Sequence, residues 1–196
     1  MSTFSDYYKD LLNWENESFK QLIHAWNPTH ASSIVADFQS AVAKSDLKSL
    51  RIAVVPGSTN QSIGNQVETF FIGEISPHLA TYRISKCSGA GYPDQVLQDK
   101  QSDQKFVLEI KATSDWNPSD SNRRVLTSSS EKLRKNFTPP ICHLLATICY
   151  QYQTSGVHVV SVRLDFIEPS TTVSVRLEAS VNHKILSQSV HQSKTI

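Results

Sequence analysis

The segment KFVLEIKA, residues 105–112, is the clearest β-strand in the chain. Side chains alternate across a strand, so Leu108 and Ile110 face one way while Glu109 and Lys111 face the other. A strand apolar enough for a protein core therefore carries a carboxylate beside an ammonium on one face. This pair belongs either to a surface hairpin or to the floor of an active site.

A second acid, Asp94, lies just upstream, after a Gly-x-Pro turn and at the start of the run DQVLQD. If this run pairs with residues 105–112 through the loop KQSDQ, Asp94 and Glu109 meet at one end of the hairpin. Two carboxylates within reach of each other suit a hard cation such as Mg²⁺. The pattern is short enough to arise by chance, so a surface hairpin stays open as the alternative.

Helical periodicity marks three segments, residues 6–26, 29–44 and 63–79. Asn27-Pro28 ends the first of them. The first two are amphipathic, and their apolar faces either pack on the core or form a subunit interface. The run PPICHLLATICYQY, residues 139–152, predicts a further apolar helix that is central to the fold.

Strand periodicity returns near the C-terminus, where two segments alternate with period two on either side of Pro169 and Ser170. They predict a β-hairpin over residues 157–182. A further strand, in ATYRISK, leads into a glycine-rich turn, and residues 114–130 are a long polar loop. This order of elements predicts an α/β (α+β) fold with a mixed central β-sheet flanked by helices.

Composition restricts the function classes. The formal net charge is only +1, with 19 Lys+Arg against 18 Asp+Glu, which argues against a histone-like coat on nucleic acid but permits a basic cleft. The odd count of cysteines, without Cys-x-x-Cys spacing, predicts buried reduced thiols. Because the chain has no signal-peptide pattern and no apolar run long enough to cross a membrane, we expect a soluble, cytoplasmic protein.

The motif itself resembles that of a large nuclease superfamily. Pro93-Asp94, followed after 14 residues by Glu109-Ile110-Lys111, resembles the PD-(D/E)XK signature. The surrounding stretches are most similar to type II restriction endonucleases of the EcoRV type, with Glu109 where that type carries Asp. The stretches that carry the resemblance are GSTNQSIGNQVETFF, GYPDQVL, LEIKATS and TSSSEKLRKNFTPP, within residues 57–150. The recognition loop expected near the C-terminus of that type has no recognisable counterpart.

The resemblance implies a restriction-endonuclease-like core in a single domain, residues 1–196. A helical part over residues 1–50 would precede the catalytic core at 57–150, and the hairpin at 157–182 would follow it. It implies Mg²⁺ held by Asp94, Glu109 and the Ile110 carbonyl, with Lys111 beside the attacking water. Products would carry 5′-phosphates. Glu68, on the third predicted helix, would be an outer or alternative metal ligand; the other interpretation is a solvated helix glutamate.

The same resemblance implies double-stranded DNA as the partner. A loop for the minor groove would comprise Ser88, Gly89 and Ala90, and further contacts would come from Arg123, Arg124, Ser128, Lys132, Arg134 and Lys135. Each of these cations could instead belong to a solvated charged face. A palindromic site would require a symmetric homodimer, and a companion DNA methyltransferase could act on the same site.

Two other functions stay open. A structure-specific repair or junction-resolving nuclease could share this core and would cut four-way junctions rather than linear duplex. A DNA-binding module without catalysis could also keep the fold, although Asp94, Glu109 and Lys111 are all present.

Overall fold

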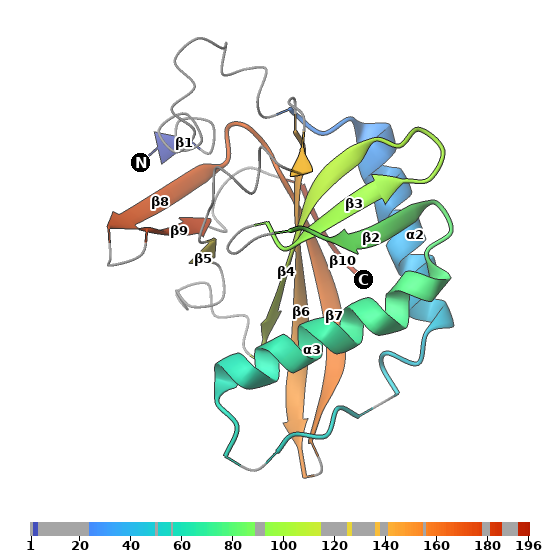
Figure 1. Cartoon of the computed structure of the whole chain (residues 1–196), viewed down its shortest axis with the longest axis vertical. Helices are drawn as coiled ribbons and strands as arrows, with labels where there is room; N and C mark the ends of the chain where they lie inside the picture. Colours follow the sequence, from blue (N-terminus) through green and yellow to red (C-terminus); the bar gives the residue numbers. More distant parts are fainter. Residues whose placement is uncertain are drawn as a thin grey trace.

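A computed structural model of the chain describes its central sheet and the helices that pack against it. The described residues are 2–3, 24–49, 51–55, 57–88, 93–114, 125–126, 136–137, 141–154, 156–177, 181–185 and 192–196. Within them the fold is a mixed α/β arrangement, as predicted, with a six-stranded mixed sheet and two α-helices (Figure 1).

The main sheet has the strand order β10-β7-β6-β4-β3-β2. Its strands are β2 (Tyr82–Lys86), β3 (Gln95–Asp99), β4 (Lys105–Thr113), β6 (His143–Gln153), β7 (Gly156–Ile167) and β10 (Gln192–Thr195). Only β4 and β6 are parallel, and every other neighbouring pair is antiparallel. The predicted hairpin of residues 94–99 with β4 is confirmed as the pair β3–β4.

Helices α2 (Pro28–Lys44) and α3 (Asn60–Ile75) confirm the second and third predicted helices, and a short 3₁₀ turn, η2 (Ser76–His78), extends α3. Asn27 and Thr59 begin them as N-caps, each accepting a backbone N–H with its side-chain oxygen. Their apolar faces join one face of the sheet in a single buried core. Of the two alternatives for the apolar face of α2, packing on the core or a subunit interface, the structure shows packing on the core.

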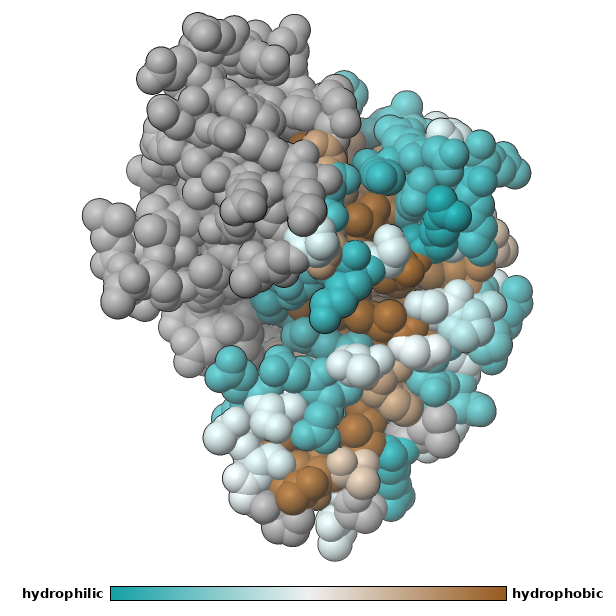
Figure 2. Space-filling model, in the orientation of Figure 1, coloured by the Kyte–Doolittle hydropathy of each residue, from teal (hydrophilic) through white to brown (hydrophobic). Residues whose placement is uncertain are grey.

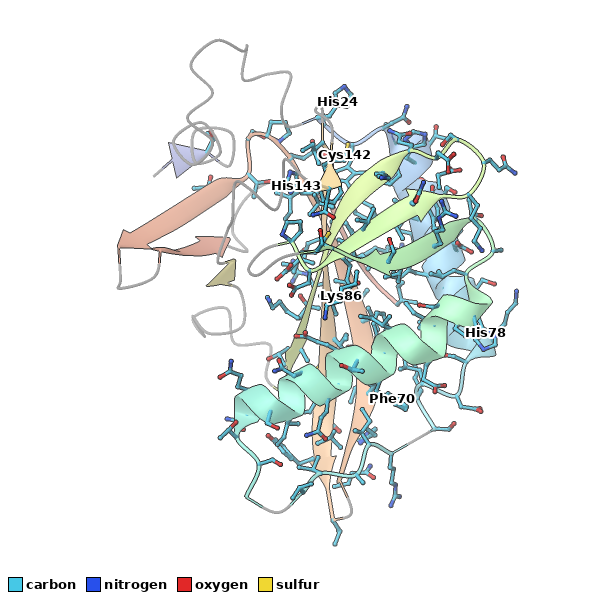
Figure 3. All side chains as sticks on the ribbon, viewed as in Figure 1. His24, Phe70, His78, Lys86, Cys142 and His143 are labelled. Carbon is cyan, nitrogen blue, oxygen red and sulfur yellow. The ribbon has the colours of Figure 1, made fainter. Side chains whose placement is uncertain are left out.

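The first predicted helix, residues 6–26, lies almost entirely outside the described residues. Its last residue, Trp26, is not helical. The Trp26 ring stacks on Phe106 with centroids 5.1 Å apart and meets Phe166 edge-on at 5.0 Å, and its Nε1 donates to the His143 carbonyl. His24, Cys142 and His143 lie together at this end of β6 (Figure 3).

The predicted helix over residues 139–152 is wrong, because this run forms strand β6. Residues 143–150 are all buried, since β6 lies between β4 and β7 with both of its faces covered. A continuous apolar run is what a central strand needs, and periodicity alone cannot distinguish such a strand from a buried helix.

The predicted C-terminal hairpin over residues 157–182 is also wrong. Its two arms are strands, but β7 pairs with β6 and β10, whereas β8 (Thr172–Leu177) pairs with β9 (Val181–Ile185). A second sheet, in the order β1-β8-β9-β5, also contains β1 (Ser2–Thr3) and β5 (Val125–Leu126). The chain therefore changes sheets at the turn that was expected to close a hairpin.

Two predictions from composition can be compared with the fold. The three cysteines, Cys87, Cys142 and Cys149, are all buried and none forms a disulfide, as predicted. In the described part of the chain, no helix is long and apolar enough to cross a membrane.

Candidate functional site

Strand β4 presents Glu109 and Lys111 on one face, as its alternation predicts. Phe106, Leu108 and Ile110 point into the apolar core on the other face. Glu109 is only 2% exposed, and its Oε1 accepts from Lys111 Nζ at 2.5 Å. The Glu109 end of this ion pair is therefore buried, and the pair is not the exposed face of a surface hairpin.

β3 and β4 separate at the motif and leave a fork between them. Their last pair is Gln95 with Leu108, whereas β4 continues beside β6 as far as Thr113. From Glu109 onward, β4 therefore has a strand on its β6 side and none on its other side within the described residues. A sheet that opens in this way gives side chains from other elements access to a strand edge.

Pro93 accounts for the end of the β3–β4 ladder. The Val107 N–H donates to the Cys142 carbonyl, so the backbone N–H and C=O of Val107 point toward β6. These groups alternate sides from one residue to the next along a strand. The N–H and C=O of Ile110 therefore point toward β3. Continuing the register places Pro93 opposite Ile110, and proline has no N–H to donate to that carbonyl. The Ile110 carbonyl, predicted as a metal ligand, therefore faces the fork.

Asp94 follows Pro93 and is held at the fork by its own backbone. Its N–H donates to Glu109 Oε2 at 3.0 Å, and its carbonyl accepts from the Cys87 N–H at 2.9 Å. Both oxygens of the Glu109 carboxylate are thus in contact, one with Lys111 and one with Asp94.

Glu68 reaches the same fork from helix α3. Burial raises its pKa to about 7; the positive charge of Lys111 opposes this shift, while the negative charges of Glu109 and Asp94 add to it. The Ala112 backbone hydrogen-bonds the Glu68 carboxyl. Ala112 lies beyond the end of β3, so the open edge of β4 provides the group that holds Glu68. The prediction that Glu68 belongs with the motif acids is consistent with this position.

The charges at the fork do not balance. Burial raises the pKa of Glu109. The negative charge of Asp94 raises this pKa further, whereas the positive charge of Lys111 lowers it. Burial alone would lower the pKa of Lys111, but the negative charges of Glu109, Glu68 and Asp94 raise it. Three carboxyl groups therefore share one ammonium, and the site favours additional positive charge.

The oxygen groups at the fork do not form a preformed metal cage. No three His, Cys, Asp or Glu side chains in the described residues lie close enough together to hold a metal ion. Mg²⁺ does not require such a cage, because it keeps several waters and is usually bound by one or two carboxylates together with substrate phosphates. Asp94, Glu109 and the Ile110 carbonyl are the oxygen groups at the fork that such a mode of binding would use.

Only Ser88 among the predicted DNA contacts is described. It is exposed, and its backbone exchanges two hydrogen bonds with the side chain of Asn136. The other predicted contacts lie outside the described residues: Gly89, Ala90, Arg123, Arg124, Ser128, Lys132, Arg134 and Lys135.

Two residues near the fork were not assigned a role from the sequence. Lys86, an exposed lysine at the end of β2, pairs with Gln95 and so lies one strand from the fork (Figure 3). Asn136 lies in TSSSEKLRKNFTPP, one of the segments that carry the family resemblance. Nothing in the spacing of this segment indicates a contact with Ser88. The placement of both residues depends on contacts between segments that are distant in the sequence, which local sequence patterns do not predict.

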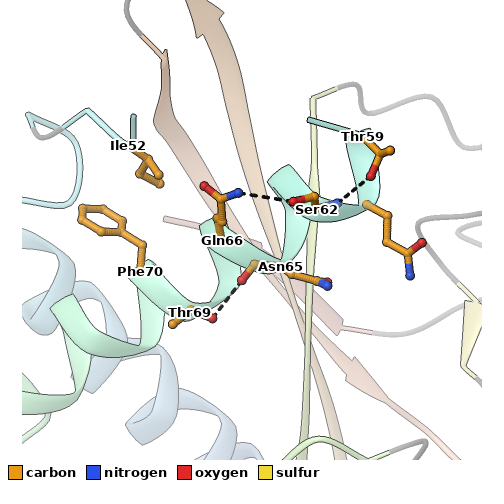
Figure 4. A pocket seen from close by; sticks show the side chains of 8 residues that line it. Ile52, Thr59, Ser62, Asn65, Gln66, Thr69 and Phe70 are labelled. Atoms are coloured by element: carbon orange, nitrogen blue, oxygen red, sulfur yellow. Dashed lines mark hydrogen bonds between the residues drawn. The ribbon is translucent and has the colours of Figure 1, made fainter. Parts of the chain in front are cut away.

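A separate hollow of about 740 Å³ lies between the first part of α3 and Ile52 (Figure 4). None of its lining side chains is charged, and none of the motif acids lines it. The lining residues are Ile52, Thr59, Gln61, Ser62, Asn65, Gln66, Thr69 and Phe70. Polar residues cover much of this side of the described molecule, with apolar patches between them (Figure 2).

Comparison with known proteins assigns the chain to no family. No family model matches the chain, and no curated protein matches it significantly.

Proposed function

We propose that the protein is a Mg²⁺-dependent type II restriction endonuclease that cuts double-stranded DNA at a specific sequence in the cytoplasm, leaving 5′-phosphates. The observation that supports it most is the meeting of Glu68, Asp94, Glu109 and Lys111 at one strand fork. These residues come from helix α3, strand β4 and the residue before β3, so their proximity is a property of the fold. Acids with an adjacent lysine are suited to phosphodiester hydrolysis.

The metal would be held by Asp94, Glu109 and the Ile110 carbonyl. When bound, Mg²⁺ would supply positive charge for the phosphate and a more acidic water. Its charge would also offset the excess of carboxylates at the fork. The protein side of the site consists of a buried, oriented carboxylate whose two oxygens already have fixed neighbours.

Lys111 is the residue suited to contact the scissile phosphate. Its side chain is 22% exposed, whereas that of Glu109 is 3% exposed, so the ammonium is the more accessible end of the pair. A phosphate that enters the fork would compete with Glu109 for the Lys111 ammonium. The ammonium would then donate to the phosphate oxygen on which negative charge develops.

Glu68 can hold or release a proton near neutral pH. Its pKa of about 7 is close to the pH at which a carboxyl is most useful for proton transfer. Its bond to the Ala112 backbone fixes it at the edge of the fork, outside the pair of Asp94 and Glu109. This position suits an outer ligand of the metal, or a group that accepts a proton from the attacking water.

The proposal is tested with a panel of DNA substrates in Mg²⁺: unmodified phage DNA, a four-way junction and single-stranded DNA. Wild type and Glu74→Gln, a control on the same helix as Glu68, are expected to give discrete fragments from phage DNA. Glu109→Gln, which keeps the shape of the side chain but removes its charge, is expected to give none.

The other outcomes assign other functions. Cutting of the junction alone would replace the restriction endonuclease with a junction-resolving nuclease. Binding of DNA without cutting of any substrate would overturn catalysis and leave a DNA-binding module.

A further inference from the structure

The side chain of Asn136 is paired with the backbone of Ser88. The Ser88 N–H donates to Asn136 Oδ1, and Asn136 Nδ2 donates to the Ser88 carbonyl, each at 3.4 Å. A primary amide offers one acceptor and two donors in a single plane, so it can bind both polar groups of one residue. Asn136 therefore holds Ser88 much as a neighbouring strand would.

Both partners of this contact are anchored by the residue next to them. Phe137, which follows Asn136, is 7% exposed, and Cys87, which precedes Ser88, is 2% exposed. The Cys87 N–H donates to the Asp94 carbonyl at 2.9 Å. Displacement of Ser88 would therefore be passed directly to the residue that binds Asp94.

The path continues from Asp94 to the buried carboxylate. The Asp94 N–H donates to Glu109 Oε2 at 3.0 Å, and Glu109 Oε1 accepts from Lys111. The Asp94 backbone is thus held at its carbonyl by Cys87 and at its N–H by Glu109. Loss of either bond would remove one of these two backbone contacts of Asp94 at the fork.

We propose that Asn136 is a positioning residue for phosphodiester cleavage: by holding Ser88, it keeps Asp94 where its N–H binds Glu109. This role rests on the proposed nuclease function and adds to it a residue outside the acidic motif. Asn136 would act through Ser88 and Cys87, which link it to Asp94. Asn136 also directly follows Lys135 in the sequence, one of the residues predicted to contact DNA.

The test compares Asn136→Ala and Asn136→Gln with wild type on the DNA that wild type cuts. Gln39→Ala, which removes an exposed amide from α2, is the matched control. For Asn136→Ala we expect kcat to fall about tenfold or more, because small displacements of catalytic groups are costly. KM should stay within about twofold and Tm within about 2 °C of wild type. Asn136→Gln should recover part of kcat, because it keeps the amide.

A second readout does not depend on cleavage. Amide hydrogen exchange at Ser88 and Asp94 should be faster in Asn136→Ala than in wild type, and unchanged in Gln39→Ala. Unchanged kcat and exchange in Asn136→Ala would overturn the positioning role while the nuclease function stands. A fall in kcat that tracks a fall in Tm, without recovery in Asn136→Gln, would also overturn it. If wild type cuts no DNA, the nuclease function itself fails, and the role in cleavage fails with it.

Discussion

Glu68 is an acid at the fork that changes its ionisation near neutral pH. Its pKa of about 7 in the folded protein lies above the ordinary value of 4.5. The folded state therefore holds the proton more tightly than the unfolded state. Stability conferred by the protonated carboxyl is fully present below about pH 4.5 and is lost as pH rises through about 7.

Glu68→Gln should therefore stabilise the metal-free protein at pH 8. The shift from 4.5 to about 7 limits the gain to about 3 kcal/mol in the free energy of unfolding, and the gain should shrink toward pH 4.5. Urea denaturation in EDTA at pH 5 and pH 8 measures it. Glu74→Gln, on the same helix, is the control. Equal stability of Glu68→Gln and wild type at pH 8 would contradict the burial of a charged Glu68 at the fork.

The prediction of the site from the sequence was most complete where the chemistry lies within one strand. Alternation alone placed Glu109 and Lys111 on the same face of β4. The approach of Glu68 could be suggested only by the family resemblance, because the path between α3 and β4 is set by tertiary packing. The contact of Asn136 with Ser88 has no local pattern and required the structure.

At the scale of elements, the fork depends on the end of strand β3. Pro93→Ala supplies the missing N–H opposite Ile110, so the β3–β4 ladder can lengthen by one pair and narrow the fork. We expect cleavage to fall about tenfold or more. Stability should change by no more than about 1 kcal/mol. Kinetics and urea denaturation measure the two effects.

Pro169→Ala, at the turn after β7, is the control for loss of a proline ring and should cut like wild type. In Pro93→Ala, protection of the new backbone amide at position 93 from hydrogen exchange would show that the ladder has lengthened. Wild-type cleavage by this variant, together with a protected amide at that position, would contradict the role of the fork.

A second prediction at the scale of elements concerns the close contact between Ile52 and the first residue of β7, Gly156. Gly156 has φ +141, a conformation that strains other residues, and a Cβ there would overlap the Ile52 carbonyl. Gly156→Ala should therefore lower the free energy of unfolding by about 2 kcal/mol or more. Gly73→Ala, on α3 with open space around it, should raise it by about 0.5–1 kcal/mol. Equal effects in urea denaturation would contradict this packing.

The elements were predicted well where their periodicity is distinct and poorly where it is absent. The helices α2 and α3 and the strand β4 follow from clear 3.6-residue or two-residue patterns. β6 was mistaken for a helix because both of its faces are buried and its apolar run has no alternation. The C-terminal strands were recognised, but their partners were not, because pairing across two sheets is a long-range property.

For the whole molecule, the main prediction is the oligomeric state. Cutting both strands of a palindromic site requires two active sites related by two-fold symmetry, so we expect a homodimer on DNA. Light scattering with and without DNA measures the mass of the complex. Because α2 uses its apolar face in the core of its own chain, that face is not available to a partner. A monomer in both conditions would contradict the dimer.

The measurement that tests the central claim most directly compares wild type with Asp94→Asn on unmodified phage DNA in Mg²⁺. DNA binding is measured in parallel in EDTA. The claim predicts discrete fragments from wild type, no fragments from Asp94→Asn, and similar metal-free binding by both proteins. Cleavage by Asp94→Asn at the wild-type rate would show that the fork of β3 and β4 is not the catalytic site.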